Sequence, residues 1–275
     1  MKSLLIGISA VAVAFATTAG AADMNTPLKA PLPPAAPAWS WTGFYVGLNA
    51  GWNGINGAGM TSAPNDPATV AFNTGCITAN ACPQNYGSAD GNGFIGGGQI
   101  GYNWQVQNWV VGLETDFQGT TTKASVTDSL PNGVSGFDPF LGTQSTRENY
   151  LGTVRGRFGV LATPTVLLYA TGGYAYASVT RNWFGSFPTF VSAWGGSSTD
   201  VLSGWTVGTG LEWALGNGFT LAAEYLYVRL NGGNGFVTAP QDAGCVPGGV
   251  PSCQFRITGS DLNNNIVRAK LNYKF

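Results

Sequence analysis

The sequence predicts an all-β protein, an eight-stranded antiparallel up-and-down β-barrel that crosses a membrane. The first observation is composition, because charged residues make up only 9% of the 275 residues, against about 25% in ordinary soluble domains. The second is that apolar residues alternate with polar ones, without the runs of about 20 apolar residues that helical membrane proteins need. The third is that short and long breaks alternate between these stretches. Together these features favour a membrane barrel.

Eight stretches of about ten residues alternate with a period of two, as strands with one apolar and one polar face do. They cover residues 44–52, 94–104, 109–117, 150–160, 166–179, 205–213, 219–227 and 267–275. In the first stretch, Phe44 and Val46 share the apolar face, while Tyr45 and Gly47 share the other. The fifth allows two lipid-facing sets, of which we favour the first: Leu168, Ala170, Tyr174 and Tyr176, or Tyr169, Thr171, Ala175 and Val179.

The breaks between the stretches predict the topology. Three are short, at residues 106–108, 162–165 and 216–218. The other four run from about 20 to about 40 residues, far above the usual connection length, and are rich in Gly, Asn, Ser, Thr and Pro. Because short and long breaks alternate, they lie at opposite ends. Four long extracellular loops and short periplasmic turns are typical of outer-membrane barrels.

The polar faces of the predicted strands carry charged residues. They hold eight charges, four of each sign, at Glu114, Asp116, Arg155, Arg157, Glu212, Glu224, Arg268 and Lys270. We expect these side chains to face the lumen and to form an ion network, because buried charges tolerate a low dielectric only when paired. Glycine between them leaves room in an interior just wide enough to be filled. The alternatives are a lipocalin, with its apolar face inward, and a soluble sandwich with the charges on its surface.

Aromatic residues gather at or near the ends of the stretches, as expected of the two interfacial girdles of a membrane barrel. The residues assigned to the girdles are Trp41, Phe44, Trp52, Trp104, Trp109, Trp205, Trp213, Phe219, Tyr225, Tyr227, Tyr273 and Phe275.

The N-terminal segment predicts export. Residues 1–22 read as a cleaved signal peptide, with Lys2, an apolar run over 4–16 and a small-residue cleavage site at 19–21; a membrane anchor is the alternative. Residues 23–40 contain five prolines and predict an extended periplasmic tether. The barrel then occupies residues 41–275.

The four cysteines fall into two close pairs, Cys76 with Cys82 and Cys245 with Cys253. An even number in an exported chain predicts two local disulfides within loops. Free thiols are the alternative.

Four segments resemble the outer-membrane immunogenic proteins of alphaproteobacteria, a porin-opacity-type group of eight-stranded outer-membrane barrels. They are 41–51 (WTGFYVGLNAG), 96–103 (GGGQIGYN), 224–227 (EYLY) and the closing strand 267–275. The resemblance covers the strands and not the long loops. It implies a surface antigen in the outer membrane of a Gram-negative cell envelope. It also implies that the terminal Phe275 is the signal recognised by the barrel-assembly machinery.

The residue types argue against catalysis. Histidine is absent, so the usual base of lipases, acyltransferases and proteases is missing. Glu114 and Asp116 could form a carboxylate pair, but a structural ion network is the simpler interpretation. We expect no cofactor and no metal, and the net charge of −1 excludes nucleic acid as a partner.

These observations favour a non-enzymatic structural and surface protein that contributes to envelope integrity, displays its loops and contacts outer-membrane lipid and lipopolysaccharide. One alternative is a porin-like pore for small solutes. Another is an adhesin that binds a host or surface ligand through its loops. Its support is a set of aromatics expected to be exposed in the third long loop: Trp183, Phe184, Phe187, Phe190 and Trp194.

Overall fold

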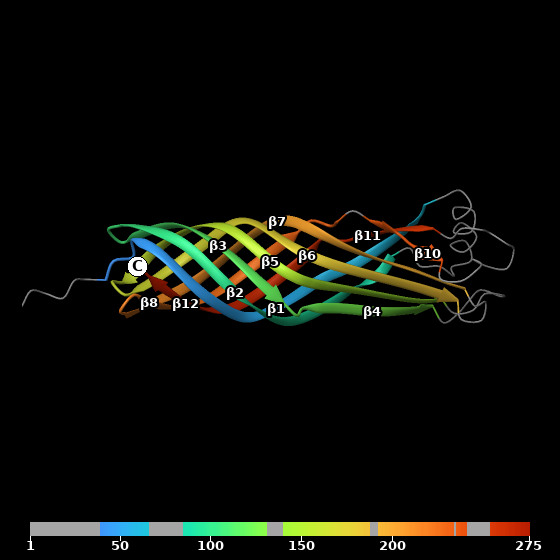
Figure 1. Cartoon of the computed structure of the whole chain (residues 1–275), viewed down its shortest axis with the longest axis horizontal. Coiled ribbons are helices and arrows are strands. Elements are labelled where there is room, and N and C mark those ends of the chain that lie inside the picture. Colours follow the sequence, from blue (N-terminus) through green and yellow to red (C-terminus); the bar gives the residue numbers. More distant parts are fainter. Residues whose placement is uncertain (1–38, 66–84, 131–139, 188–191, 234, 241–253) are drawn as a thin grey trace, which may run out of the picture. The chain divides into compact units, whose positions relative to one another are not determined.

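The computed structural model describes residues 39–65, 85–130, 140–187, 192–233, 235–240 and 254–275 (Figure 1). The described part contains strands and turns and no helix long and apolar enough to cross a membrane. The strands are β1 (Gly43–Pro64), β2 (Asn85–Val106), β3 (Trp109–Thr120), β4 (Lys123–Leu130), β5 (Phe140–Thr163), β6 (Val166–Phe187), β7 (Ser192–Gly216), β8 (Phe219–Leu230), β9 (Phe236–Val237), β10 (Ala239–Pro240), β11 (Phe255–Gly259) and β12 (Leu262–Lys274).

The strands close into a ring. Neighbouring strands pair antiparallel around the ring in the order β1, β2, β3, β5, β6, β7, β8 and β12. The ring closes because β12 also pairs with β1. β4 continues the line of β3 between β2 and β5, and β11 extends the wall beside β1. The predicted fold, an eight-stranded antiparallel up-and-down barrel, is therefore confirmed, since no edge strand is left in the ring.

Tight turns join the strands at one end, here called the turn end. Only two residues separate β2 from β3, β5 from β6 and β7 from β8. Gln107 and Asn217 adopt positive φ angles of 54° and 52°, the left-handed conformation that the favoured two-residue hairpin turns require. The three short breaks expected from the sequence are confirmed, and their hairpins fix the register of the strands that they join.

The strands are much longer than the alternating stretches predicted. β6 and β7 remain paired from Val166 with Trp213 to Phe187 with Ser192, so most of the expected third loop is strand. Thr and Ser hydroxyls replace apolar side chains on the outer face there; Thr180 and Thr199 hydrogen-bond across the pair at 2.9 Å. The alternation persists, but its outward positions become polar. The barrel wall therefore continues beyond its apolar band toward the opposite, loop end.

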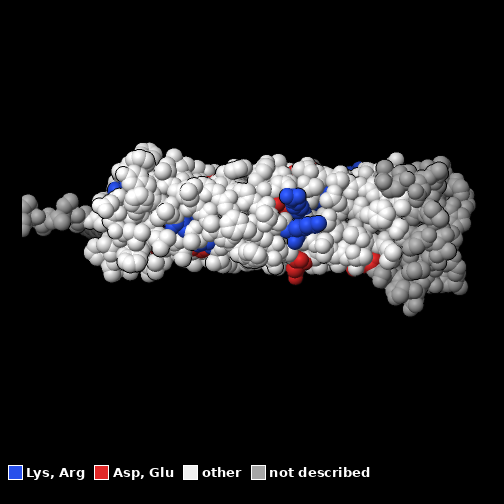
Figure 2. All heavy atoms as spheres, turned by 60° about the horizontal axis from the view of Figure 1, so that its bottom comes forward, with Lys and Arg blue, Asp and Glu red and all other residues white. Residues whose placement is uncertain are grey.

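The outward face carries a continuous apolar band. Leu48, which lies on β1 midway between Phe44 and Trp52, is 71% exposed, and both of these aromatics are also exposed. In the fifth stretch, Leu168 and Tyr174 point outward, so the favoured assignment of its faces is correct. On the face drawn in Figure 2, charged side chains are sparse on the described surface. Exposed side chains of this size over a whole wall indicate a surface that is covered by lipid.

Aromatic side chains border this band on both sides. Toward the turn end, exposed rings include Trp104, Trp109, Trp213 and Phe219; toward the loop end they include Trp52, Phe94, Phe117, Tyr174 and Trp205. Trp41 is an exception among the residues assigned to the girdles. It is 1% exposed, because it precedes β1 and turns into the barrel instead of following the outward side of a strand.

Leu48→Arg tests the lipid-facing assignment. An arginine on the lipid face near the bilayer midplane costs roughly 2–4 kcal/mol in barrels of this class. The free energy of unfolding, measured by urea titration in lipid vesicles, should fall by that amount. Val201→Arg is the matched control, since Val201 is exposed on β7 beyond Trp205, and it should change stability little. Equal effects of the two substitutions would contradict the assignment.

Candidate functional site: the barrel lumen

The inward residues of the barrel form three layers that differ in chemistry. Apolar and aromatic side chains lie at the turn end, a network of ion pairs lies at the depth of the apolar band, and a second apolar layer lies toward the loop end. On β3, for example, the charged Glu114 and Asp116 lie between the outward rings of Trp109 and Phe117. The layers therefore follow one another along the barrel axis.

The turn end is closed by Trp41. Its indole packs with Val110, Leu167, Tyr169 and Ala214. The indole Nε1–H donates to the Pro164 carbonyl oxygen at 3.2 Å, and its backbone N–H donates to Gln105 Oε1 at 2.8 Å. These two bonds tie the segment before β1 to the β5–β6 turn and to β2. The indole consequently covers the lumen where a channel would open.

Arg155 lies at the centre of the charged layer. Its guanidinium contacts three carboxylates: Glu114 at 2.5 Å, Asp116 at 2.7 Å and Glu224 at 3.1 Å. All four side chains are fully buried. Because Glu114 and Asp116 come from β3 and Glu224 from β8, the contacts cross the lumen and do not merely join neighbouring strands.

Arg268 and Lys270 supply a second pair of cations from β12. Arg268 contacts Asp116 at 2.7 Å and Glu224 at 2.6 Å. Lys270 contacts Glu114 at 2.6 Å and Glu224 at 3.3 Å. Each of these three carboxylates is therefore bound by at least two cations, which compensates the cost of removing it from water.

Arg157 completes the network on the side of the turn end. It contacts Glu212 at 2.6 Å and Glu114 at 3.7 Å, and its guanidinium lies over the Tyr169 ring, 4.0 Å from the centroid. The structure thus brings together all eight charged residues singled out in the sequence, and each of the four carboxylates and four cations has an opposite charge in contact.

Neutral side chains that the sequence analysis does not name as site residues complete the hydrogen bonding of this layer. The Tyr45 hydroxyl donates to Glu114 at 2.7 Å and accepts from Arg157 at 2.9 Å. The Tyr169 hydroxyl donates to Glu224 at 2.8 Å. Their position on the inward face was the available signal, since Tyr45 shares the polar face of its strand with Gly47 and Asn49.

Glycine makes room for these tyrosines. A Cβ added at Gly101 would collide with the Tyr45 ring, and one added at Gly210 would collide with the Tyr169 ring. Both glycines lie on inward positions of the neighbouring strands, β2 and β7. The rings therefore lie over the neighbouring strands and fill the lumen between the charged groups.

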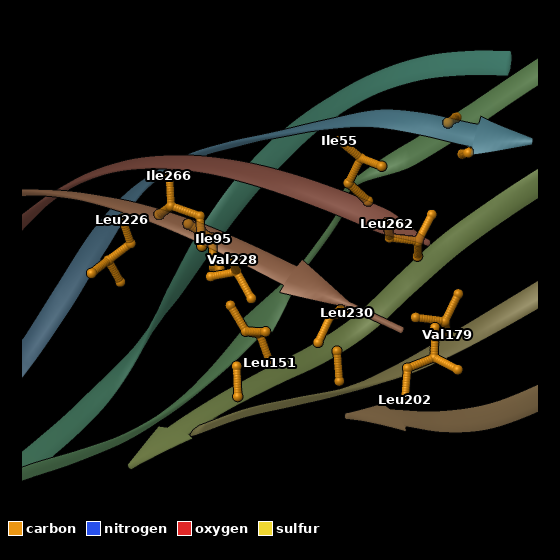
Figure 3. Packing of buried hydrophobic residues seen from close by; sticks show 14 of the residues in the cluster. Ile55, Ile95, Leu151, Val179, Leu202, Leu226, Val228, Leu230, Leu262 and Ile266 are labelled. Atoms are coloured by element: carbon orange, nitrogen blue, oxygen red, sulfur yellow. The ribbon is translucent and has the colours of Figure 1, made fainter. Parts of the chain in front are cut away.

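The layer toward the loop end is apolar (Figure 3), a feature that the alternation of the sequence does not predict. Within this layer lies Glu148, fully buried, whose carboxylate accepts hydrogen bonds from the amides of Asn53 at 3.1 Å and Asn264 at 2.6 Å. The side chains of the layer point toward one another from opposite walls, and each is 3% exposed or less: Ile55, Ile95, Leu151, Val179, Leu202, Leu226, Val228, Leu230, Leu262 and Ile266.

The burial of the charged layer indicates whether the lumen is open or filled. The side chains that form the network are between 0% and 3% exposed. A channel wide enough for water would leave the side chains that line it exposed to solvent. The eight-stranded interior is filled at this depth, as is typical for barrels of this size.

Other residues singled out in the sequence lie elsewhere. Phe275 follows β12; its ring is 73% exposed, and its backbone N–H donates to the Phe44 carbonyl oxygen at 3.0 Å. Its role as an assembly signal stays a prediction. Residues 1–38, which include the expected signal peptide and most of the tether, lie outside the described residues. So do Cys76, Cys82, Cys245 and Cys253.

The prediction that the aromatic residues of the third long loop are exposed is wrong in part. Trp183 and Trp194 are 2% and 1% exposed and face inward from β6 and β7. Phe184 points outward and is 45% exposed, while the side chains of Phe187 and Phe190 lie outside the described residues. Because the strands extend so far, alternation places the tryptophans inside the wall, where they cannot meet a ligand from outside.

Comparison with known proteins agrees with this architecture. A family model described as "Outer membrane protein beta-barrel domain" matches residues 8–275. The chain belongs to this family. It is 37% identical over 281 residues to the 31 kDa outer-membrane immunogenic protein of Brucella melitensis, covering 100% of both chains. The expected outer-membrane location and the resemblance to alphaproteobacterial immunogenic proteins are thereby confirmed.

Two further matches are more distant. This outer-membrane barrel is 31% identical to the 22 kDa outer membrane protein of Rhizobium leguminosarum over 196 residues, covering 70% of this chain and 66% of the relative. The crystal structure of the outer membrane protein OprG from Pseudomonas aeruginosa matches with a TM-score of 0.45 at 9% identity, covering 85% of this chain and 97% of that one.

The charged layer offers this outer-membrane barrel structural cohesion and little chemistry. The oxygens of Glu114 and Asp116 are occupied by Arg155, Arg268 and Lys270, so the pair has no side open to a substrate. Within the described strands, His, Cys, Asp and Glu side chains form no cluster of three or more that could hold a metal ion. By the usual arrangement of such barrels, the turn end is periplasmic and the loop end extracellular.

Glu224→Gln tests the contribution of the network. It removes a carboxylate that binds Arg155, Arg268 and Lys270, and losing one partner of a buried ion pair costs about 3–5 kcal/mol. Urea titration in lipid vesicles measures the free energy of unfolding. Arg229→Gln is the control on the same strand, because Arg229 forms an exposed pair with Asp261 of a kind worth about 0–1 kcal/mol.

A second substitution makes this test specific. Adding Lys270→Met to Glu224→Gln restores equal numbers of buried positive and negative charges and should recover part of the lost stability. If Glu224→Gln were no more harmful than Arg229→Gln, the ion network would not be what holds the lumen together.

Proposed function

We propose that this protein is a non-enzymatic structural barrel of the outer membrane that strengthens the envelope and carries a long polar wall and loops to the cell surface. The observation that supports this function is the filled lumen. Ion pairs, tyrosines and two apolar layers occupy it, and Trp41 covers its periplasmic end. A barrel with such an interior serves through its presence in the membrane and through its outer surface.

The absence of catalysis in this proposal rests on the state of the candidate groups. Histidine does not occur in the sequence. The buried carboxylates of the charged layer are neutralised by neighbouring cations, whereas a catalytic acid or base has to reach the reacting atoms of a substrate. Glu148 is enclosed by the amides of Asn53 and Asn264.

Display at the surface is supported by the length of the wall. β5, β6 and β7 each exceed 20 residues, while about ten residues suffice for a tilted strand to cross the membrane. The extra length, at about 3.3 Å per residue, raises the connections well above the lipid. Relatives that are named for their immunogenicity agree with a surface that is presented outside the cell.

Deletion of the encoding gene tests this function against that of a pore. A structural role predicts greater leakage of periplasmic enzymes and greater sensitivity to detergents, both restored by the wild-type chain. The rate at which a small hydrophilic β-lactam enters the periplasm, measured by its hydrolysis by a periplasmic β-lactamase in intact cells, should not fall. Slower entry in the deletion strain, with an unchanged barrier to detergents, would support a pore and contradict the structural role.

A further inference from the structure

Two cations lie side by side on the outside of the barrel wall. Lys123 on β4 and Arg147 on β5 are directly opposite each other in the β4–β5 pairing. The wall is otherwise poor in charge; on the face that Figure 2 draws, Lys and Arg atoms gather about midway along it, with Asp or Glu atoms beside them. Both side chains point outward and are exposed.

Their height on the barrel is set by neighbouring aromatics. Lys123 is opposite Asn92 of β2, two residues beyond the exposed ring of Phe94. Arg147 lies three residues beyond Tyr150, whose ring packs against Phe117 with centroids 5.2 Å apart. Since aromatic girdles mark the membrane interface, the two cations lie just outside the apolar band, at the level of lipid headgroups.

The charge of this pair is not neutralised by the described wall. Neither residue forms an ion pair with a described carboxylate. Glu148, next to Arg147, is buried in the lumen, and the Oδ1 of Asp90 accepts a hydrogen bond from the Gly57 N–H on the other side of β2. By contrast, the exposed Arg229 is bound to Asp261 at 2.9 Å, and this bond lowers the pKa of the Asp261 carboxyl group.

The two cations border a hollow of about 330 Å³ in the outer wall. Its other lining residues carry hydroxyls and amides and no carboxylate: Thr121, Ser145, Asn149, Thr180 and Asn182. The Asn149 amide donates to the Thr180 hydroxyl at 3.0 Å, and Asn182 donates to Ser145 at 3.3 Å. The floor is therefore fixed by its own hydrogen bonds, while the cations remain available.

We propose that this hollow binds a phosphate group on the headgroup of an outer-leaflet glycolipid. Arginine offers two parallel N–H donors to a phosphate and lysine adds a point charge, and basic pockets at the membrane surface are a recurrent way of recognising anionic headgroups. The acyl chains of the same lipid would lie along the apolar band below, against Phe94 and Tyr150. The site goes beyond the structural function, because it gives the barrel a specific partner in its own leaflet.

Binding of lipid A to the purified, folded barrel tests the proposal. Native mass spectrometry in detergent counts the lipids retained during titration with bisphosphorylated lipid A. The double variant K123Q/R147Q should bind at least about tenfold more weakly, since two charge-assisted contacts are lost. R229Q is the matched control, an exposed cation at a similar height that is already paired, and it should stay within about twofold of the wild type.

Two further arms identify the ligand. Dephosphorylated lipid A should bind the wild type no better than bisphosphorylated lipid A binds the double variant. Millimolar inorganic phosphate should not displace the lipid; displacement would mean that free phosphate is the ligand and would overturn the proposal. Binding by K123Q/R147Q equal to the wild type, or an equal loss in R229Q, would also overturn it. A retained difference in gel migration between unboiled and boiled samples shows that each variant is folded.

Discussion

The structure depends on the mutual neutralisation of four carboxylates and four cations inside a closed ring of eight strands. A ring of this size leaves an interior that side chains alone fill, so charges placed there cannot keep their water. Removing one ion from water costs several kcal/mol even after relaxation. The barrel meets this cost because every charge of this network has an opposite partner at contact distance, and Arg155, Arg268 and Lys270 each contact more than one carboxylate.

The other features of the interior follow from this network. Cross-lumen contacts require short distances between walls, and glycines such as Gly101 and Gly210 allow the tyrosine rings to lie between them. The hydroxyls of those rings donate to Glu114 and Glu224. The apolar layers above and below keep water from the ends of the network, which strengthens the charge–charge attraction within it. Chemically different layers thus contribute to one closed core.

Much of the fold and of the charged layer could be predicted from the sequence, because alternate residues of a barrel strand face the lipid and the lumen. Phe44 and Leu48 marked the lipid face, and the inward positions of Glu114 and Arg155 followed from the same period. Alternation alone could not show where a strand leaves the membrane, since pairing continues when Thr180 and Thr199 replace apolar residues. For the same reason the alternation predicts a loop where Trp183 and Trp194 lie on β6 and β7. Trp41 precedes β1, so the alternation of that strand does not predict whether its side chain points inward or outward. An apolar residue such as Ile95 or Leu151 fits the lipid-facing side and the lumen side of a strand equally well.

The central claim is that the ion network and its flanking layers close the lumen. The most direct measurement is the conductance of the purified, folded protein in planar lipid bilayers, with a known porin as the positive control under the same conditions. The account predicts no reproducible unitary conductance from this protein. A steady single-channel conductance that scales with the number of inserted molecules would contradict it, because ions would then pass through an interior that the structure shows to be filled.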